Sequence, residues 1–203
     1  MARPKIKINW VKVQKKINRE MPKSRRTLVK VSKLAEKQLR VAKRELISEF
    51  NNHPITKEIE AGPDANNTSG TLGGYGNLFS YIGFYEEEDP IELVRLLLNE
   101  YELKKPKVVI RKSNIQYKFR VIGMTKKRLF AATRLSWLGK SWLQGIESGI
   151  SGIGKYLHDS ADYLHGNSRS STGIQSSQRI RGGAYRPTQY ISALLNSFEK
   201  KLR

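Results

Sequence analysis

The chain has no cysteine among its 203 residues. Disulfides and thiolate chemistry are therefore excluded, and a zinc site would have to use histidine and carboxylate ligands alone. The sequence also has no apolar run near the roughly twenty residues that span a bilayer. Because the N-terminus has no apolar signal-peptide core, we expect synthesis and use in the cytoplasm, unless an assembly carries the protein elsewhere.

Acidic residues are scarce, and their distribution is uneven. The chain has 18 Asp and Glu against 38 Lys and Arg, a net charge of +20. The net charge is +12 over residues 1–50, −7 over 51–100, +10 over 101–150 and +5 over 151–203. A basic protein with one acidic segment suits a nucleic acid partner, or the docking of basic faces against acidic faces of neighbouring subunits.

Catalytic patterns are missing as well. The chain has three histidines. His158, Asp162 and His165 share a helical face, but two histidines and one carboxylate without a further supporting group are poor evidence for a metal site. The serines have no paired acid and base nearby in sequence. We therefore expect no enzyme activity, no metal and no cofactor.

The most regular stretch runs from Ser24 to Phe50 and contains neither glycine nor proline. Its apolar residues recur every three or four positions, as on one stripe of an α-helix, and Ser24 is a suitable N-cap. The stripe consists of Leu28, Val31, Ala35, Leu39, Ala42, Leu46 and Phe50. Lys and Arg dominate the remaining faces, so one side favours a core and the other water or an anion.

Shorter elements are expected on both sides of a turn-rich region. We expect helices over Trp10–Glu20 and from Asp89-Pro90 through Tyr101, the latter because Asp can cap and Pro fits the first turn. Leu78–Phe84 is aromatic and β-branched, which predicts a strand. Lys107–Arg111 and Ile115–Ile122 alternate and predict a β-hairpin.

The C-terminal half is expected to be less regular. We expect an irregular segment after Lys126-Lys127-Arg128, a helical stretch around Trp142–His158, and a last amphipathic helix that Thr188 caps. Together these elements predict an α+β fold with a long N-terminal helix on a small, mainly antiparallel sheet. Residues 1–22 would form an arm with a short helix, and 23–203 one domain.

Long loops are expected at about residues 61–77 and 166–187. Gly70, Gly73, Gly74 and Gly76 match neither GxGxxG nor the phosphate-loop pattern. The first loop is then either a flexible surface loop or one that orders only against a neighbouring subunit.

Two groups of residues are candidates for interactions. Complementary charge and loop position suggest subunit-interface residues: Glu86, Glu87, Glu88, Asp89, Arg40, Lys43, Arg44, Tyr75, Leu78 and Phe79. Basic residues in the hairpin and in an Arg/Gly segment are candidates for DNA or anion contacts: Lys112, Lys118, Arg120, Arg179, Arg181 and Arg186. The acidic group is more easily explained by helix capping and solvation than by a metal. The hairpin pattern also fits a half-buried amphipathic hairpin without nucleic acid.

Several segments of the sequence are typical of one class of protein. FNNHPITKEIEAG, SGTLGGYGNLFSYIGF, SWLQGIESGISGIGKYL, SSTGIQSSQRIRGG and PTQYISALLNSF lie in order between Phe50 and Phe198. In this combination the chain resembles neck or tail-completion proteins of tailed bacteriophages, most closely those with contractile tails.

The resemblance implies a non-enzymatic virion protein that forms a homo-oligomeric ring at the head–tail joint. Its partners would be other neck, connector or tail proteins, with transient contact to genomic double-stranded DNA and none to membranes. The alternative is a basic nucleic-acid-binding protein, which the charge alone also fits.

Overall fold

A computed structural model of the chain describes residues 10–72, 77–111, 114–136, 139–149 and 187–202. It combines helices with an antiparallel sheet, as predicted for an α+β chain, and the sheet has two strands in the described residues. The chain divides into two compact units: residues 1–41 with 102–122, and residues 42–101 with 123–203. A hairpin far downstream in the sequence thus belongs to the same compact unit as the N-terminal helices.

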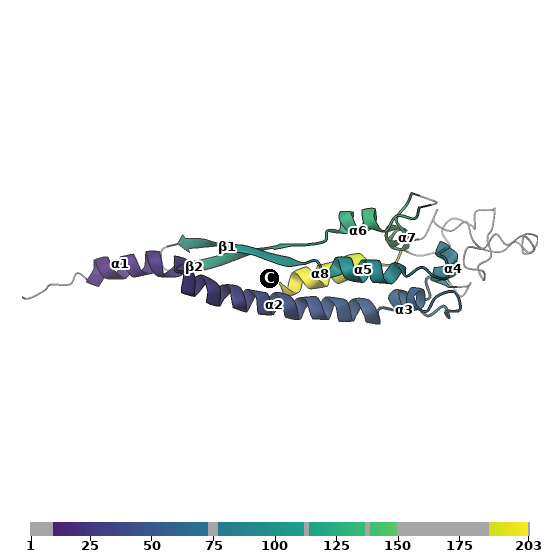
Figure 1. Ribbon diagram of the computed structural model, residues 1–203, viewed down its shortest axis with the longest axis horizontal. Helices are drawn as coiled ribbons and strands as arrows, with labels where there is room; N and C mark the ends of the chain where they lie inside the picture. Colours follow the sequence, from purple (N-terminus) through teal and green to yellow (C-terminus); the bar gives the residue numbers. More distant parts are fainter. Residues whose placement is uncertain (1–9, 73–76, 112–113, 137–138, 150–186, 203) are drawn as a thin grey trace, which may run out of the picture. The chain divides into compact units, whose positions relative to one another are not determined.

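The first unit begins with two helices separated by a short 3₁₀ turn (Figure 1). These are α1 (Trp10–Glu20), η1 (Met21–Lys23) and α2 (Arg25–Asn52), which continues into the second unit after residue 41. Pro22 lies in the first turn of η1, where a backbone N–H has no partner within the helix, so proline loses no hydrogen bond there. The Ser24 Oγ accepts from the N–H of Thr27 at 3.3 Å, which confirms the predicted cap. Both predicted helices are confirmed.

The hairpin completes the first unit. β1 (Glu102–Arg111) pairs with β2 (Asn114–Ile122), from Glu102 opposite Ile122 to Arg111 opposite Asn114. The register shifts between Lys104 and Lys107, where Pro106 cannot donate to the ladder. The predicted hairpin is confirmed. Its first strand starts earlier than expected, at Glu102, because pairing is also present on the N-terminal side of Pro106.

Few side chains are fully buried in this unit. Among its described side chains only Pro22 and Leu39 are buried. The Tyr117 hydroxyl donates to the Pro22 carbonyl at 3.0 Å and so ties the hairpin to the turn before α2. One stripe of α2 and one face of β2 are half-buried: Leu28, Val31, Ala35, Tyr117, Phe119 and Val121.

The second unit contains the main core. It comprises the end of α2 with α3 (Pro54–Glu60), α4 (Leu78–Ile82), α5 (Pro90–Leu98), α6 (Lys126–Ala132), α7 (Trp142–Glu147) and α8 (Ile191–Lys201). Each of these helices buries apolar side chains, among them Leu46, Phe50, Ile55, Ile59, Leu78, Ile82, Ile91, Leu98, Leu129, Leu143 and Ile191. The C-terminal half of the predicted α2 stripe is therefore confirmed.

Aromatic rings connect the two ends of this unit's sequence. The Tyr190 ring stacks on Phe50 with centroids 6.1 Å apart. Its hydroxyl lies 2.6 Å from the Thr56 Oγ1, and both groups are buried. Burial raises the pKa of the Tyr190 hydroxyl, which therefore stays protonated at neutral pH. Trp142 meets Phe84 edge to face, with ring centroids 5.7 Å apart.

The predicted strand over Leu78–Phe84 is wrong, because Leu78–Ile82 forms helix α4. Asn77 caps this helix by accepting from the N–H of Ser80 at 2.9 Å. Gly83 ends it in the left-handed conformation, at φ 86°, which glycine adopts without strain. The cap and the terminal glycine thus outweigh the β propensity of the aromatic and branched residues between them.

Other boundaries also differ from expectation. α5 ends at Leu98 instead of reaching Tyr101. The residues after Thr125 form α6 rather than an irregular segment, and the Thr125 Oγ1 caps this helix by accepting from Arg128 N–H at 3.3 Å. α7 starts at Trp142 as predicted. The predicted continuation to His158 lies outside the described residues.

The last helix begins with a cap supplied from elsewhere in the chain. Thr188 does not cap it: the N-cap is Tyr190, whose side chain makes no capping bond. Instead the Glu147 carboxylate accepts from Ser192 N–H at 2.6 Å and Ser192 Oγ at 2.7 Å, and lies 2.7 Å from Lys126 Nζ. Burial acts to raise the pKa of Glu147, but these hydrogen bonds outweigh it and the pKa is lowered. The carboxylate therefore stays ionised and suits the N-terminus of a helix.

The glycine-rich segment after α3 is anchored by a buried carboxylate. Glu58 is 1% exposed, and its two oxygens accept from Ser69 N–H at 2.7 Å and Leu78 N–H at 2.8 Å. Asn77 Nδ2 donates to the Pro63 carbonyl across the same segment. The sequence left open whether this loop is flexible or orders against a neighbouring subunit; in the structure, hydrogen bonds within the chain hold its described residues.

His53 makes the stability of the second unit depend on pH. Its Nδ1 accepts from Ile55 N–H at 3.3 Å and caps α3, and its ring centroid lies 4.6 Å from that of Tyr190. Burial lowers the pKa of His53 below its ordinary 6.5. The unfolded chain therefore takes up the proton first as pH falls, and stability decreases below the unfolded pKa of about 6.5.

We expect a lower melting temperature at pH 5.5 than at pH 7.5, because protonation of His53 opposes both its burial and its capping bond. Asn is a good N-cap without a titrating group. His53→Asn is therefore the matched control, and it should lose most of this difference. An unchanged pH difference in His53→Asn would show that other groups cause it.

Candidate interaction surfaces

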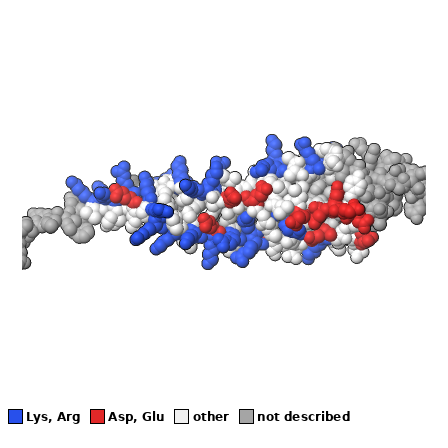
Figure 2. Space-filling model, viewed as in Figure 1, with Lys and Arg blue, Asp and Glu red and all other residues white. Residues whose placement is uncertain are grey.

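The first unit carries nearly all the net charge. Residues 1–41 and 102–122 contain 21 Lys and Arg against 3 Glu, a difference of +18. The second unit contains 17 basic and 15 acidic residues, a difference of +2. Figure 2 shows basic side chains over the N-terminal helices and hairpin, and an acidic group within the second unit. Five ion pairs of the described residues lie in the second unit, where Arg95, Lys126 and Lys201 are joined to glutamates.

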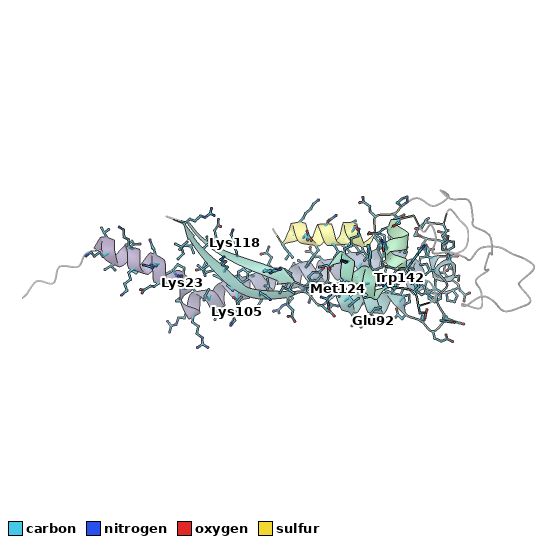
Figure 3. All side chains as sticks on the ribbon, turned by 90° about the horizontal axis from the view of Figure 1, so that it is seen from above. Lys23, Glu92, Lys105, Lys118, Met124 and Trp142 are labelled. Carbon is cyan, nitrogen blue, oxygen red and sulfur yellow. The ribbon has the colours of Figure 1, made fainter. Side chains whose placement is uncertain are left out.

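One face of the hairpin presents cations in cross-strand pairs. Lys104 lies opposite Arg120, and Lys107 lies opposite Lys118. All four side chains are exposed and have no partner among the described residues. Figure 3 marks Lys118 on this hairpin together with Lys105, which lies in the irregular stretch of β1. Like charges directly opposite each other destabilise a ladder, so this face costs the hairpin stability.

The α2 helix exposes apolar side chains beside lysines. Leu34 is 68% exposed and Val41 37% exposed, and they are seven positions apart, so they share a helical face. Lys30 and Lys37 belong to the same face by this periodicity, and both are exposed. A face that mixes apolar and cationic side chains suits a protein partner better than a partner that offers negative charge alone.

The acidic surface of the second unit centres on the turn before α5. Glu86, Glu87, Glu88 and Asp89 are all exposed. Asp89 caps α5 as predicted, because its Oδ1 accepts from the N–H groups of Ile91 and Glu92 at 3.1 and 2.9 Å. Glu88 accepts from Tyr85 N–H at 3.0 Å. Glu86 and Glu87 have no such partner among the described residues and remain available to an external cation.

The neighbouring carboxylates are already neutralised. Arg95 Nη2 lies 2.6 Å from Glu60 Oε1, Arg95 Nη1 pairs with Glu92, and Arg95 Nε donates to Asn51 Oδ1 at 3.1 Å. The bond to Glu92 contributes most to raising the pKa of the Arg95 guanidinium. This network connects α2, α3 and α5, and it leaves the turn before α5 as the free acidic surface.

A cationic cavity lies between α6 and α7, with a volume of about 780 Å³. Its lining includes Lys127, Arg134 and Lys140 together with Phe130. Lys126 also lines it, but that side chain is paired with Glu147 and lies 5.2 Å above the Phe130 ring. The remaining cations give the cavity a positive potential that suits an anionic group.

The other predicted interface residues fall into two classes. Arg40 and Arg44 are exposed on α2. Lys43 points inward: its Nζ donates to the carbonyls of Asn99 and Tyr101 at 2.5 and 3.3 Å, where the C-terminus of α5 favours a cation. Leu78 and Phe79 are 0% and 2% exposed and belong to the core, because α4 turns both side chains inward.

The predicted DNA or anion contacts are described only in part. Lys118 and Arg120 lie on the exposed hairpin face. Tyr75, Lys112, Arg179, Arg181 and Arg186 lie outside the described residues, as do His158, Asp162 and His165. Within the described ranges, no group of three His, Asp or Glu side chains could hold a metal ion. No helix in those ranges is both long and apolar enough to cross a membrane.

Sequence reasoning missed Lys104 and Lys107 as members of the cationic face. The predicted first strand begins at Lys107 and therefore does not include Lys104. The alternation of Lys118 and Arg120 was visible, but their partners follow only from the register across the irregular stretch.

The chain matches no protein-family model, and no significant match was found among curated proteins or solved structures.

Proposed function

We propose that this chain is a non-enzymatic structural subunit that assembles with copies of itself into a ring, at the neck or tail end of a tailed bacteriophage. The observation that carries the proposal is the division of charge, +18 in the first unit against +2 in the second. The basic first unit of one copy would dock on the acidic turn of the next.

Complementary surfaces on one chain favour this kind of assembly. A contact between two different surfaces of identical subunits repeats around an axis and closes into a ring when the rotation allows it. Glu86 and Glu87 offer uncompensated negative charge, and the exposed face of α2 offers positive charge. Opposite potentials of this kind direct association and fix its register.

The apolar side chains on α2 support a protein partner. Leu34 and Val41 are exposed on the same face as Lys30 and Lys37, and the first unit buries few of its own side chains. Covering Leu34 in an interface would remove apolar area from water, which contributes about 25 cal/mol per Å². The place of the ring within a virion rests on the resemblance of the chain to neck and tail-completion proteins.

Reversing the acidic turn should weaken assembly. We expect the purified protein to form closed oligomers at low salt that dissociate as salt rises, seen by mass photometry and as rings in negative-stain images. Glu86→Lys with Glu87→Lys should raise the concentration for half-assembly at least about tenfold, because like-charge contacts across an interface cost several kcal/mol.

The control makes the same charge change elsewhere in the second unit. Glu100→Lys with Glu199→Lys alters two exposed carboxylates outside the turn and should assemble much like the native chain. A monomer at every salt and protein concentration would contradict the ring. Phage particles made without the protein should show filled heads separate from tails, and normal joining would contradict the location in the neck.

A further inference from the structure

We propose that the exposed face of the β1–β2 hairpin binds the sugar-phosphate backbone of double-stranded nucleic acid. The residues that would contact phosphates are Lys104, Lys107, Lys118 and Arg120. This inference stands on the hairpin alone and does not require the ring.

The first argument is the register of the cations. Directly opposite residues on an antiparallel ladder have Cβ atoms about 5 Å apart, and alternate residues along a strand are roughly 7 Å apart. The pairs Lys104–Arg120 and Lys107–Lys118 thus gather four positive charges on one small patch. None of the four forms an ion pair with a described carboxylate, and Glu102, opposite Ile122, is the one acidic residue on this face of the described ladder. Anions placed between the members of each pair would relieve the repulsion.

The second argument concerns the kind of anion. Duplex DNA carries one negative charge for about every 1.7 Å of helix axis, so its backbone supplies charges along a whole row of cations. The exposed carboxylates of this chain's own acidic turn lie in one short segment, Glu86–Asp89. A row of paired cations on a ribbon is better matched by the duplex backbone than by such a compact group.

The third argument distinguishes a duplex from a single strand. Proteins that bind single strands combine basic grooves with aromatic side chains on which bases stack. Here the aromatic residues of β2, Tyr117 and Phe119, alternate with Lys118 and Arg120 and therefore lie on the opposite face. Tyr117 is also engaged with Pro22. The cationic face has charge but no stacking platform, so we expect contacts to phosphates without base readout.

A variant can remove this binding while keeping the hairpin folded. Lys104→Glu would place a carboxylate opposite Arg120, and Lys118→Glu would place one opposite Lys107. Each substitution replaces a repulsive cross-strand pair with an attractive one. The double variant should therefore retain the circular dichroism spectrum of the native chain.

The test is binding of the full-length chain to a fluorescent duplex of mixed sequence, followed by anisotropy over a series of salt concentrations. We expect native binding to weaken linearly in log affinity against log salt, and the double variant to bind at least about tenfold more weakly. Its salt slope should be smaller by about 2, because each substituted lysine no longer neutralises a phosphate. Lys57→Glu with Lys200→Glu makes the same charge change on exposed residues of the second unit and is the control.

The hairpin assignment is overturned if the double variant loses no more affinity than the control. Tighter binding to a single strand than to the duplex overturns the choice of ligand. Mass photometry of the same variants separates this result from assembly: loss of oligomers with unchanged DNA binding would mean that the hairpin face binds an acidic protein surface instead.

Discussion

Glu58→Ala is expected to lower the free energy of unfolding by about 2–5 kcal/mol. The side chain is buried, and its two oxygens accept from the backbone N–H groups of Ser69 and Leu78. Alanine would leave both donors without a partner, and each unsatisfied buried group costs about 1–3 kcal/mol. Because Leu78 begins α4, the loss should also release the start of that helix from α3.

Urea unfolding followed by circular dichroism and intrinsic fluorescence measures this effect. Glu58→Gln keeps the shape and one acceptor oxygen, so it should lose less stability than alanine. Glu60→Gln, two positions along the same helix, removes an exposed ion pair with Arg95 and should cost less than about 1 kcal/mol. If Glu58→Ala and Glu60→Gln were equally stable, the proposed anchoring of the loop would be wrong.

Gly123→Ala is expected to destabilise the second unit by about 2–3 kcal/mol. A Cβ at this position would lie 2.2 Å from the Tyr101 Cδ1 atom, far inside van der Waals contact. The ring has little freedom to move, since its hydroxyl donates to the Met124 carbonyl at 2.7 Å and its centroid lies 4.6 Å from that of Phe198. Burial, together with the charge of Glu199, raises the pKa of Tyr101 to about 12, so the hydroxyl remains a donor at neutral pH.

A double-mutant cycle tests the cause of this effect. Tyr101→Ala removes the ring that the new methyl group would strike, so Gly123→Ala should cost little in that background. The expected result is a strong departure from additivity in urea unfolding. Additive effects would show that the backbone at Gly123, and not the Tyr101 ring, determines the cost.

Local signals in the sequence were sufficient for several helices. α2 has Ser24 as its cap and an unbroken apolar stripe, and α5 has Asp89 and Pro90 at its start. These signals act within one turn of the backbone, so a sequence window contains all the groups involved. α4 shows the limit of propensity, because five residues rich in β formers became a helix between Asn77 and Gly83.

Long-range bonds account for much of what the sequence could not reveal. Glu147 caps a helix that begins at Ile191, and Lys43 binds the carbonyls that follow α5. Nothing near Glu147 or Lys43 in sequence indicates a distant backbone partner. The interaction surfaces were predictable in charge but not in register, since the irregular stretch at Pro106 decides which lysine faces Arg120.

The paired cations of the hairpin have a consequence for how this sequence could change. Lys104 is paired with Arg120, and Lys107 with Lys118. In a chain selected for folding alone, replacing one member of each pair with glutamate would make the hairpin more stable. A single-base change converts a lysine codon into a glutamate codon. A sequence that keeps all four positive charges is therefore expected to serve a requirement other than its own folding, and relaxed selection should remove these lysines first.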